Sequence, residues 1–307
     1  MIKAFGQNIS DSYAVTRNGW IELTNPNAEE IAQISTSLDL DFDDLIAAMD
    51  LNETNRIEKF DKYALVIIDT PIKNSELNYK SVPLGIILTT SNIITVCCSE
   101  NNILTKFHES YENQYAKKDK SEFVYAILLE ATMAYQVALL SINRSREKIE
   151  QKVQEITGEP ELINLHRLES TLVHFYTSIK GNDTVITKMK RYKEMQNISD
   201  EQDLLNNILI ESQQNLEMAR IYREIVGSTR ELVSSIMEAR LNNVMKRLTS
   251  ITVILSIPTI VSGIYGMNLN PIGMPFSQIA NGFTILIFII MIISLTLILI
   301  LRRKKLI

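Results

Sequence analysis

Charge is missing from one long stretch of this sequence. The chain carries 31 basic and 36 acidic residues, yet none of them lies between Leu248 and Leu301. One membrane-spanning helix needs roughly 20 apolar residues, and the stretch is about twice what a single crossing requires. A soluble domain would expose charged side chains over such a distance. The absence predicts an integral membrane protein with two C-terminal transmembrane helices.

Cysteine and histidine are scarce. The two cysteines, Cys97 and Cys98, are neighbours within an apolar run. Adjacent cysteines rarely bridge each other, so we expect a buried strand in a reducing compartment. None of the three histidines, His108, His166 and His174, has a metal-ligating partner three or four positions away. This pattern argues against a transition-metal carrier.

The first residues, MIKAFGQNIS, have no apolar signal core. We therefore expect no cleaved leader, and a cytoplasmic location for the polar part of the chain. No nucleophile–base set, phosphate loop or metal-ligand cluster is recognisable, so we expect no enzyme. The net charge is −5 even with the basic tail Arg302–Lys305. An acidic surface repels nucleic acid and attracts cations, although ordinary solubility is the simpler explanation.

Residues 1–115 have the pattern of a small α/β domain. Helical spacing over Ala28–Ser37 and Asp43–Met49 predicts two helices, with Asn27 and Asp41 as N-caps. Short runs rich in Ile and Val, bounded by turn residues, predict strands. The predicted strands are Trp20–Leu23, Tyr63–Asp69, Pro83–Thr89 and Asn92–Cys98. The order of the strands stays open.

Residues 116–198 have a helical pattern. Apolar residues recur at helical spacing over Ser121–Ile156, and the Gly-Glu-Pro sequence at 158–160 ends this helix. A second helix is predicted over Glu161–Ile179. The Gly-Asn-Asp sequence at 181–183 predicts a turn before a third segment, Thr184–Met195.

Residues 199–265 predict one very long helix. Ser199 followed by Gln202 is a capping-box start, and no proline follows until Pro258. From Leu205 to Ile236 apolar residues recur at gaps of mostly three, four or seven, a seam for packing against other helices. An unbroken helix would be roughly 100 Å long at 1.5 Å per residue. Such a helix cannot bury its seam alone, so we expect an oligomer.

The charge-free stretch divides into two crossings, about 248–265 and 283–301, joined by the uncharged loop 266–282. Each is long enough for a hydrocarbon core of about 30 Å. Arg240, Lys246 and Arg247 precede the first crossing, and the basic tail 302–307 follows the second. The positive-inside rule therefore places both termini in the cytoplasm and the loop outside the plasma membrane.

The two crossings differ in polarity. The second is aliphatic on all sides, as suits a lipid-facing helix, whereas the first carries a polar stripe at steps of three or four residues. The stripe consists of Asn242, Met245, Thr249, Thr252, Ser256 and Thr259. Intramembrane hydroxyls also bond their own backbone or pack helix against helix. A stripe on one crossing only favours a water-filled axis, which needs several subunits because one helix cannot enclose a pore.

Tyr265, Gly266, Met267 and Asn268 stand at the outer end of the first crossing. Gly-Met-Asn alone is unspecific, but in this place, between a long helix and a second crossing, it resembles the fingerprint of the CorA family of divalent-cation channels. The sequences Arg-Ile-Glu at 56–58 and Pro-Leu-Gly-Ile-Ile at 83–87 are also similar to the cytoplasmic domain of bacterial members. The resemblance covers the whole chain and implies a CorA-like funnel, a homopentamer, and Mg²⁺ as transported and regulatory ion.

The resemblance also implies a set of pore residues. Counted back from Asn268 without gaps, the family's inner asparagine falls on Asn242 and its outer threonine on Thr259. Its hydrophobic constriction falls on Met245 and Leu248. All four residue types match.

Two positions depart from the family pattern. The outer loop of the family often has an acid after Met-Pro, but here Phe276 follows. The aspartate that in some members holds the regulatory metal between subunits falls on Asn207. Three nearby acids, Asp203, Glu211 and Glu217, are candidates to substitute for it.

The motif suits the chemistry of Mg²⁺, which loses its water reluctantly and demands octahedral oxygen geometry. A ring of Asn268 side-chain oxygens and backbone carbonyls could bond the intact hydration shell without holding the ion too tightly. Gly266 would let the backbone turn and present its carbonyls. We expect Met267 to support the loop by packing.

We therefore expect Mg²⁺ influx across the lipid bilayer, with Co²⁺ or Ni²⁺ as incidental passengers and closure by cytoplasmic Mg²⁺. A zinc-transporting member of the same superfamily is an alternative, but the crossings have no acid or histidine for a proton relay. A membrane-anchored helical scaffold without transport is a third possibility, and the polar stripe argues against it.

Overall fold

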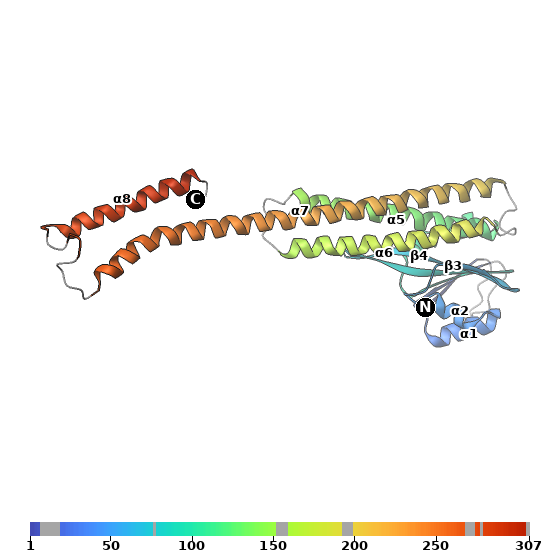
Figure 1. Ribbon diagram of the computed structural model, residues 1–307. Helices are drawn as coiled ribbons and strands as arrows, with labels where there is room; N and C mark the ends of the chain where they lie inside the picture. The colour runs from blue at the N-terminus through green and yellow to red at the C-terminus, as the bar shows by residue number, and fades with distance from the viewer. Residues whose placement is uncertain are drawn as a thin grey trace. The chain divides into compact units, whose positions relative to one another are not determined.

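The computed structural model describes residues 1–6, 19–75, 78–151, 159–191, 199–267, 274–276 and 279–304. The chain divides into two compact units, Met1–Glu231 and Leu232–Ile307. The N-terminal unit contains a mixed sheet and helices, and the C-terminal unit is helical (Figure 1). This confirms the predicted class: an α/β domain, long helices and apolar C-terminal helices.

A six-stranded sheet forms the centre of the N-terminal unit, in the order β1-β2-β6-β5-β4-β3. Neighbouring strands are antiparallel except β2 and β6, which pair in parallel with Trp20 opposite Ile93. The strands are β1 Ile2–Phe5, β2 Trp20–Thr24, β3 Arg56–Lys59, β4 Tyr63–Ser75, β5 Asn78–Thr89 and β6 Ile93–Cys97. The four predicted strands are confirmed, and β1 and β3 were not predicted.

Both faces of this sheet are buried. Along β4, Val66 and Ile68 face one core while Leu65 and Ile67 face the other, because successive side chains of a strand point to opposite faces. The helices α1 (Ala28–Leu38) and α2 (Phe42–Ala47) cover one face. The helices α5 (Lys120–Gln151) and α6 (Glu159–Met189) cover the other (Figure 1). Burial on both faces explains why the central strands are continuous apolar runs.

The predicted N-caps are confirmed. The Asn27 side chain accepts a hydrogen bond from the backbone N–H of Glu30 at 2.8 Å, and the Glu30 carboxylate accepts one from the Asn27 N–H. Asp41 caps α2 by accepting from the Asp43 N–H at 2.9 Å. Two short helices, α3 (Asn102–Thr105) and α4 (Tyr111–Gln114), lie between β6 and α5 and were not predicted.

The predicted turn at residues 181–183 is wrong, because α6 runs unbroken through them from Glu159 to Met189. Gly181 serves a different purpose there. A Cβ at this position would lie 2.4 Å from Oδ1 of Asn55, so glycine is needed for the close approach of the helix to the chain before β3. The Asn55 side chain then donates to Oδ1 of Asn182 at 2.8 Å.

Asn182 joins α6 to the sheet. β3 pairs with β4 only from Ala64 to Ile67, so it does not reach Asp69. The Asn182 amide takes the place of the missing strand: it accepts from the Asp69 N–H and donates to the Asp69 carbonyl, both at 2.8 Å. Its side chain is buried, with 6% exposed.

We expect Asn182→Ala to destabilise the N-terminal unit. Two backbone groups of β4 lose their partner, which costs roughly 2–3 kcal/mol. The urea midpoint, followed by the fluorescence of the single tryptophan, the buried Trp20, should fall clearly. Asn206→Ala, at an exposed position in the helix of residues 199–265, is the matched control. It should unfold like the unchanged protein. Equal midpoints for both variants would refute the bridging role.

Two further helices complete the chain: α7 (Ser199–Tyr265) and α8 (Gly282–Arg303). The predicted single helix of residues 199–265 is confirmed, with 67 residues and Pro258 inside it. The side chains of the predicted capping box at Ser199 and Gln202 lie outside the described residues.

Among the described residues, three helices, α5, α7 and α8, are long and apolar enough to cross a membrane. In α5, 56% of the most apolar window is buried within the structure, against 6% in α7 and 0% in α8. The apolar side chains of α5 therefore belong to the core over the sheet. Those in the most apolar windows of α7 and α8 are largely uncovered in the single chain, which leaves lipid or other copies to cover them.

Candidate ion pathway

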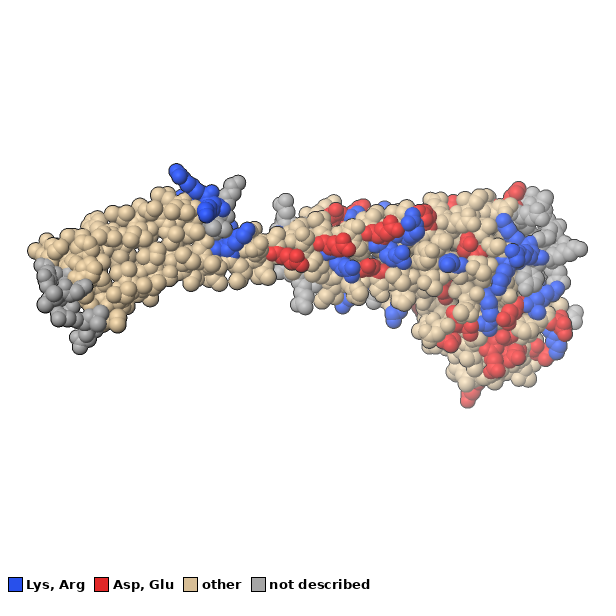
Figure 2. Space-filling view, in the orientation of Figure 1, with Lys and Arg blue, Asp and Glu red and all other residues tan. Residues whose placement is uncertain are grey.

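The C-terminal unit pairs the end of α7 with α8. Figure 2 shows this part almost free of charge, with basic side chains gathered at one end of it. Ser250, on the α7 face that meets α8, is buried with 4% exposed. Six of the seven predicted pore residues are exposed in the single chain, and Ser256 is half-buried; the six are Asn242, Met245, Leu248, Thr249, Thr252 and Thr259. Most of the polar stripe is thus exposed in the single chain.

Three hydroxyls of the stripe donate to their own helix. The Thr252 hydroxyl donates to the Leu248 carbonyl at 2.9 Å, and the Thr259 hydroxyl to the Leu255 carbonyl at 2.9 Å. The Ser256 hydroxyl donates to the Val253 carbonyl at 2.8 Å. A hydroxyl has one proton and two lone pairs, so each oxygen keeps lone pairs to offer and no proton. Such oxygens accept hydrogen bonds from the water shell of a cation.

The inner end of the stripe borders a hollow between the helices. Asn242, Met245 and Thr249 line it from α7, and Leu301 lines it from α8. Met245 and Leu248 are 51% and 57% exposed. These two side chains are therefore uncovered in the single chain and accessible to a neighbouring copy.

Only part of the Tyr-Gly-Met-Asn motif lies within the described residues, because Asn268 falls outside them. The Gly266 N–H donates to the Ser262 carbonyl at 2.9 Å, which continues the last turn of α7. Gly266 does not have a positive φ, and its absent Cβ would lie 3.3 Å from that same carbonyl. A close approach, and not a left-handed turn, accounts for glycine here. Met267 is 56% exposed in the single chain.

The three candidate regulatory acids do not converge within one chain. Asp203, Glu211 and Glu217 lie along α7, and each residue advances a helix by about 1.5 Å. Glu217 already has a partner: its carboxylate accepts from Arg220 at 2.5 and 3.0 Å, and this hydrogen bonding lowers the pKa of Glu217. Among the described residues, no three His, Cys, Asp or Glu side chains form a metal-binding group.

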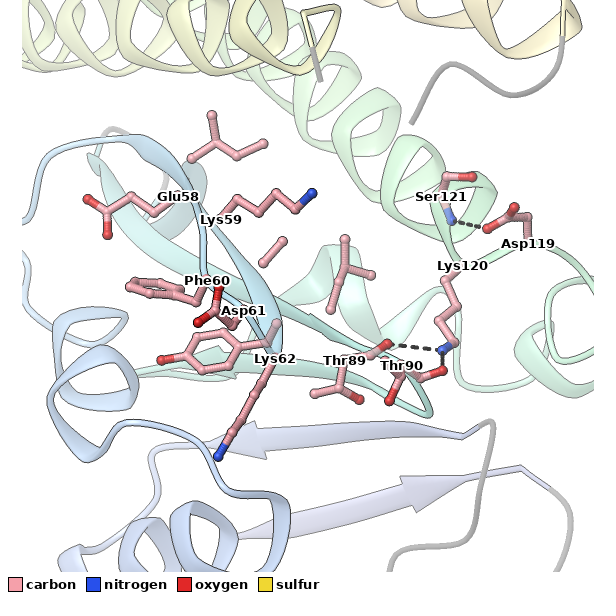
Figure 3. Close-up of a pocket in the computed structure, with 14 residues that line it drawn as sticks. Glu58, Lys59, Phe60, Asp61, Lys62, Thr89, Thr90, Asp119, Lys120 and Ser121 are labelled. Atoms are coloured by element: carbon pink, nitrogen blue, oxygen red, sulfur yellow. Dashed lines mark hydrogen bonds between the residues drawn. The ribbon is translucent and has the colours of Figure 1, made fainter. Parts of the chain in front are cut away.

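A cavity of about 600 Å³ opens in the N-terminal unit beside β3, β4 and the start of α5 (Figure 3). The Lys120 amine donates to the carbonyls of Thr89, at 3.0 Å, and Thr90, and burial lowers its pKa. Asp119 Oδ1 accepts from the Ser121 N–H at 3.2 Å. The lysine thus ties the turn after β5 to α5, and we assign no ion to this cavity.

Two contacts made by residues of α7 were not predicted from the sequence. The Tyr265 hydroxyl donates to the Pro275 carbonyl across a separation of 10 residues. Arg220 neutralises Glu217 and also bonds Glu224 at 2.9 Å. The Arg220 spacing of three and four is visible in the sequence, but such pairs are common on exposed helices.

Comparison with known proteins identifies the family. The family profile described as "CorA-like Mg2+ transporter protein" matches residues 17–304. The cobalt/magnesium transport protein CorA of Methanocaldococcus jannaschii is 25% identical over 292 residues, which are 93% of this chain and 90% of that protein. The protein of the same name from Thermotoga maritima is 20% identical and covers 84% of this chain and 74% of its own length.

A solved structure has the same fold. The complete structure of the CorA magnesium transporter from Methanocaldococcus jannaschii superposes with a TM-score of 0.83 at 23% identity, and covers 100% of this chain and 99% of that one. Because the family profile also spans nearly the whole sequence, the chain belongs to the CorA-like Mg²⁺ transporter family, a family of membrane ion transporters and not of enzymes.

Proposed function

We propose that this protein carries Mg²⁺ into the cell as a homopentameric, multi-pass channel, with Co²⁺ and Ni²⁺ as lesser substrates. The observation that carries this proposal is the stripe on α7, whose hydroxyls at Thr252, Ser256 and Thr259 give their protons to their own helix. Rings of such oxygens accept from hydrated cations and have no charge to trap them. Five copies would place the stripe around one axis and leave α8 toward lipid.

Selectivity is assigned to the outer motif. A ring of Asn268 side-chain oxygens would bond the water shell of Mg²⁺, whose dehydration is costly. Neutral amide oxygens suit this task because carboxylates at the same place would hold the ion more tightly and slow its exit. Gly266, which ends the last turn of α7, would present its carbonyl near the same ring.

Gating is assigned to the inner end of the stripe. Rings of Met245 and Leu248 would form a narrow apolar throat, and such a throat excludes water and hydrated ions. Cytoplasmic Mg²⁺ between subunits would offset repulsion between facing carboxylates and so stabilise the closed state by differential binding. Asp203 and Glu211 are the better candidates for this sensor, because Glu217 is already paired with Arg220.

Flux into vesicles tests the function. Purified protein in proteoliposomes should admit Mg²⁺ fastest when Mg²⁺, Co²⁺, Ni²⁺ and Zn²⁺ are measured in parallel, with and without a proton gradient. Zn²⁺ flux that depends on the proton gradient would instead support the zinc transporter. Vesicles that admit none of the four ions would support the scaffold and overturn the proposal.

The proposed topology places residues 1 to about 247 and the tail 302–307 in the cytoplasm and the loop 266–282 outside. Single cysteines at Asn270 and at Lys305, in a background without Cys97 and Cys98, should react with an impermeant reagent from opposite sides of the membrane. The expectation rests on the basic residues at both ends of the charge-free stretch and on their absence from the loop between the two crossings. Labelling of both positions from one side would rule this topology out.

A further inference from the structure

A buried amide lies where α7 packs against α5 and α6 in the N-terminal unit. The Asn215 side chain of α7 is fully buried, with 0% exposed, and its nitrogen donates to the Thr132 carbonyl of α5 at 2.8 Å. Its oxygen, Oδ1, has no hydrogen-bond partner within the part of the chain that the structure describes. Burying an amide oxygen without a donor is costly, so this oxygen requires a partner.

A second buried oxygen without a partner lies on α6. This atom is Oδ1 of Asp183, whose side chain as a whole is half-buried. The Ser212 hydroxyl of α7, on a residue that is 2% exposed, is hydrogen-bonded to the Asp183 side chain. Residues three apart on a helix are neighbours on one face, so Ser212 places the Asp183 carboxyl group beside Asn215. Two acceptors therefore face the same contact between α6 and α7.

The hydroxyl groups around these acceptors have no proton left to donate. Ser212 has one hydroxyl proton, and Asp183 accepts it. The Thr132 hydroxyl gives its proton to the Leu128 carbonyl at 2.8 Å. An ionised carboxylate only accepts, whereas a protonated carboxyl group has one O–H donor. A single proton on Asp183, donated to Oδ1 of Asn215, would satisfy both oxygens.

The electrostatic surroundings of Asp183 favour the same arrangement. Burial raises the pKa of Asp183 because it disfavours the ionised form, and the hydrogen bond from Ser212 lowers the pKa by less. The charged groups on the packed helices are Lys180 of α6, which is exposed, and Glu211 of α7, which is half-buried. On α5, Glu130 is already in an ion pair. Burial therefore decides the direction of the shift.

We propose that Asp183 binds a proton and donates it to Asn215, and that this proton joins α6 to α7. The neighbouring Asn182 side chain holds the backbone of β4, so the joint connects α7 to the sheet through α6. The packing of α7, which also contains the proposed gate, would then depend on pH. The inference goes beyond the proposed function and does not depend on ion transport.

Asp183→Asn tests the proton because an amide has N–H donors at every pH. The folded protein raises the pKa of Asp183 above its ordinary value of 3.8. The bond is therefore fully present below that value and is lost as the pH rises through the raised pKa. The variant should melt like the unchanged protein at about pH 4. At pH 8, well above the ordinary value, its melting temperature should be higher by roughly 2–4 °C.

Thermal unfolding of the full-length protein is followed by the fluorescence of Trp20 at a series of pH values between these two. Glu231→Gln makes the same change of acid to amide at an exposed position of α7. This matched control should melt like the unchanged protein at every pH. A melting difference between Asp183→Asn and the unchanged protein that is the same at every pH would overturn the proposal, because a water bridging an ionised Asp183 to Asn215 would produce it.

A second variant tests the acceptor. Asn215→Leu removes the oxygen and nearly keeps the volume, so in this background Asp183→Asn should no longer raise the melting temperature at pH 8. A gain as large as in the unchanged background would show that the proton is not donated to Asn215. Melting with and without Mg²⁺ completes the test: stabilisation by Mg²⁺ that is lost in Asp183→Asn would place a metal ion there and contradict the proposal.

Discussion

Replacing Asn268 by alanine should reduce Mg²⁺ uptake to the background of empty vesicles, while the proposed oligomer stays assembled. The reason is chemical: alanine has no oxygen to accept from the water shell, and Mg²⁺ loses that shell too reluctantly to pass without partners. The loop offers no substitute, because it has no acidic residue between Gly266 and Gly282. Uptake is measured in proteoliposomes and assembly by size-exclusion chromatography.

Two controls distinguish the loss of the Asn268 amide from a general disturbance of the loop. Asn270→Ala removes the same side chain two positions further on and should leave most of the flux intact. Met267→Leu keeps an apolar side chain of similar size and should reduce the flux only mildly. Undiminished flux through assembled Asn268→Ala protein would show that ion selection occurs elsewhere in the chain.

Introducing a charge at the proposed inner throat should have the opposite effect on ion flow. Met245→Asp or Leu248→Asp should keep current flowing at cytoplasmic Mg²⁺ of about 1 mM or more, a condition under which we expect the apolar throat of the unchanged protein to exclude water. Both side chains are more than half exposed in the single chain, so neither aspartate need disturb the core of the subunit. In an oligomer, the ring of carboxylates would hydrate the constriction and attract the cation.

The matched control is Met245→Leu, which exchanges one apolar side chain for another and should close normally. Currents are recorded from excised patches while Mg²⁺ on the cytoplasmic side is varied. If both aspartate variants still close fully at high Mg²⁺, the throat is not the gate. The constriction would then have to lie nearer Thr259 or the outer motif.

The parts of the fold that were predictable depend on local patterns. The central strands are apolar on both faces, and the N-caps Asn27 and Asp41 act within three residues, so short windows of sequence reveal them. The edge strands β1 and β3 have four residues each and form because longer strands beside them offer free edges. The parallel pairing of β2 with β6 joins segments about 70 residues apart, and no local pattern records it.

Gly181 shows how a local rule fails. Glycine followed by Asn-Asp usually marks a turn, but the nearest neighbour of this glycine is Asn55, far away in sequence. Helix α6 continues because the Asn182 side chain is hydrogen-bonded to both the backbone N–H and the carbonyl of Asp69 in β4. Tertiary contacts here outweigh the turn propensity of three residues, and those contacts are invisible until the fold is known.

The candidate pathway also combines features that could be predicted from the sequence with features that could not. Helical spacing was sufficient to predict the stripe on α7, and the family resemblance placed the motif. The hydroxyl-to-carbonyl bonds within the helix follow from the residue type and its neighbours four positions before. The link from Tyr265 to Pro275 depends on how the loop folds back, and Arg220 competes for Glu217 through side-chain geometry. The first contact leaves no local pattern in the sequence, and the spacing of the second is too common on exposed helices to identify it.

Current through membrane patches that contain only the purified protein tests the central claim most directly. We expect a Mg²⁺ current to appear when Mg²⁺ on the cytoplasmic side is removed, and to disappear again when about 1 mM or more is restored. The absence of Mg²⁺ current under both conditions, from protein shown to be assembled in the bilayer, would contradict it.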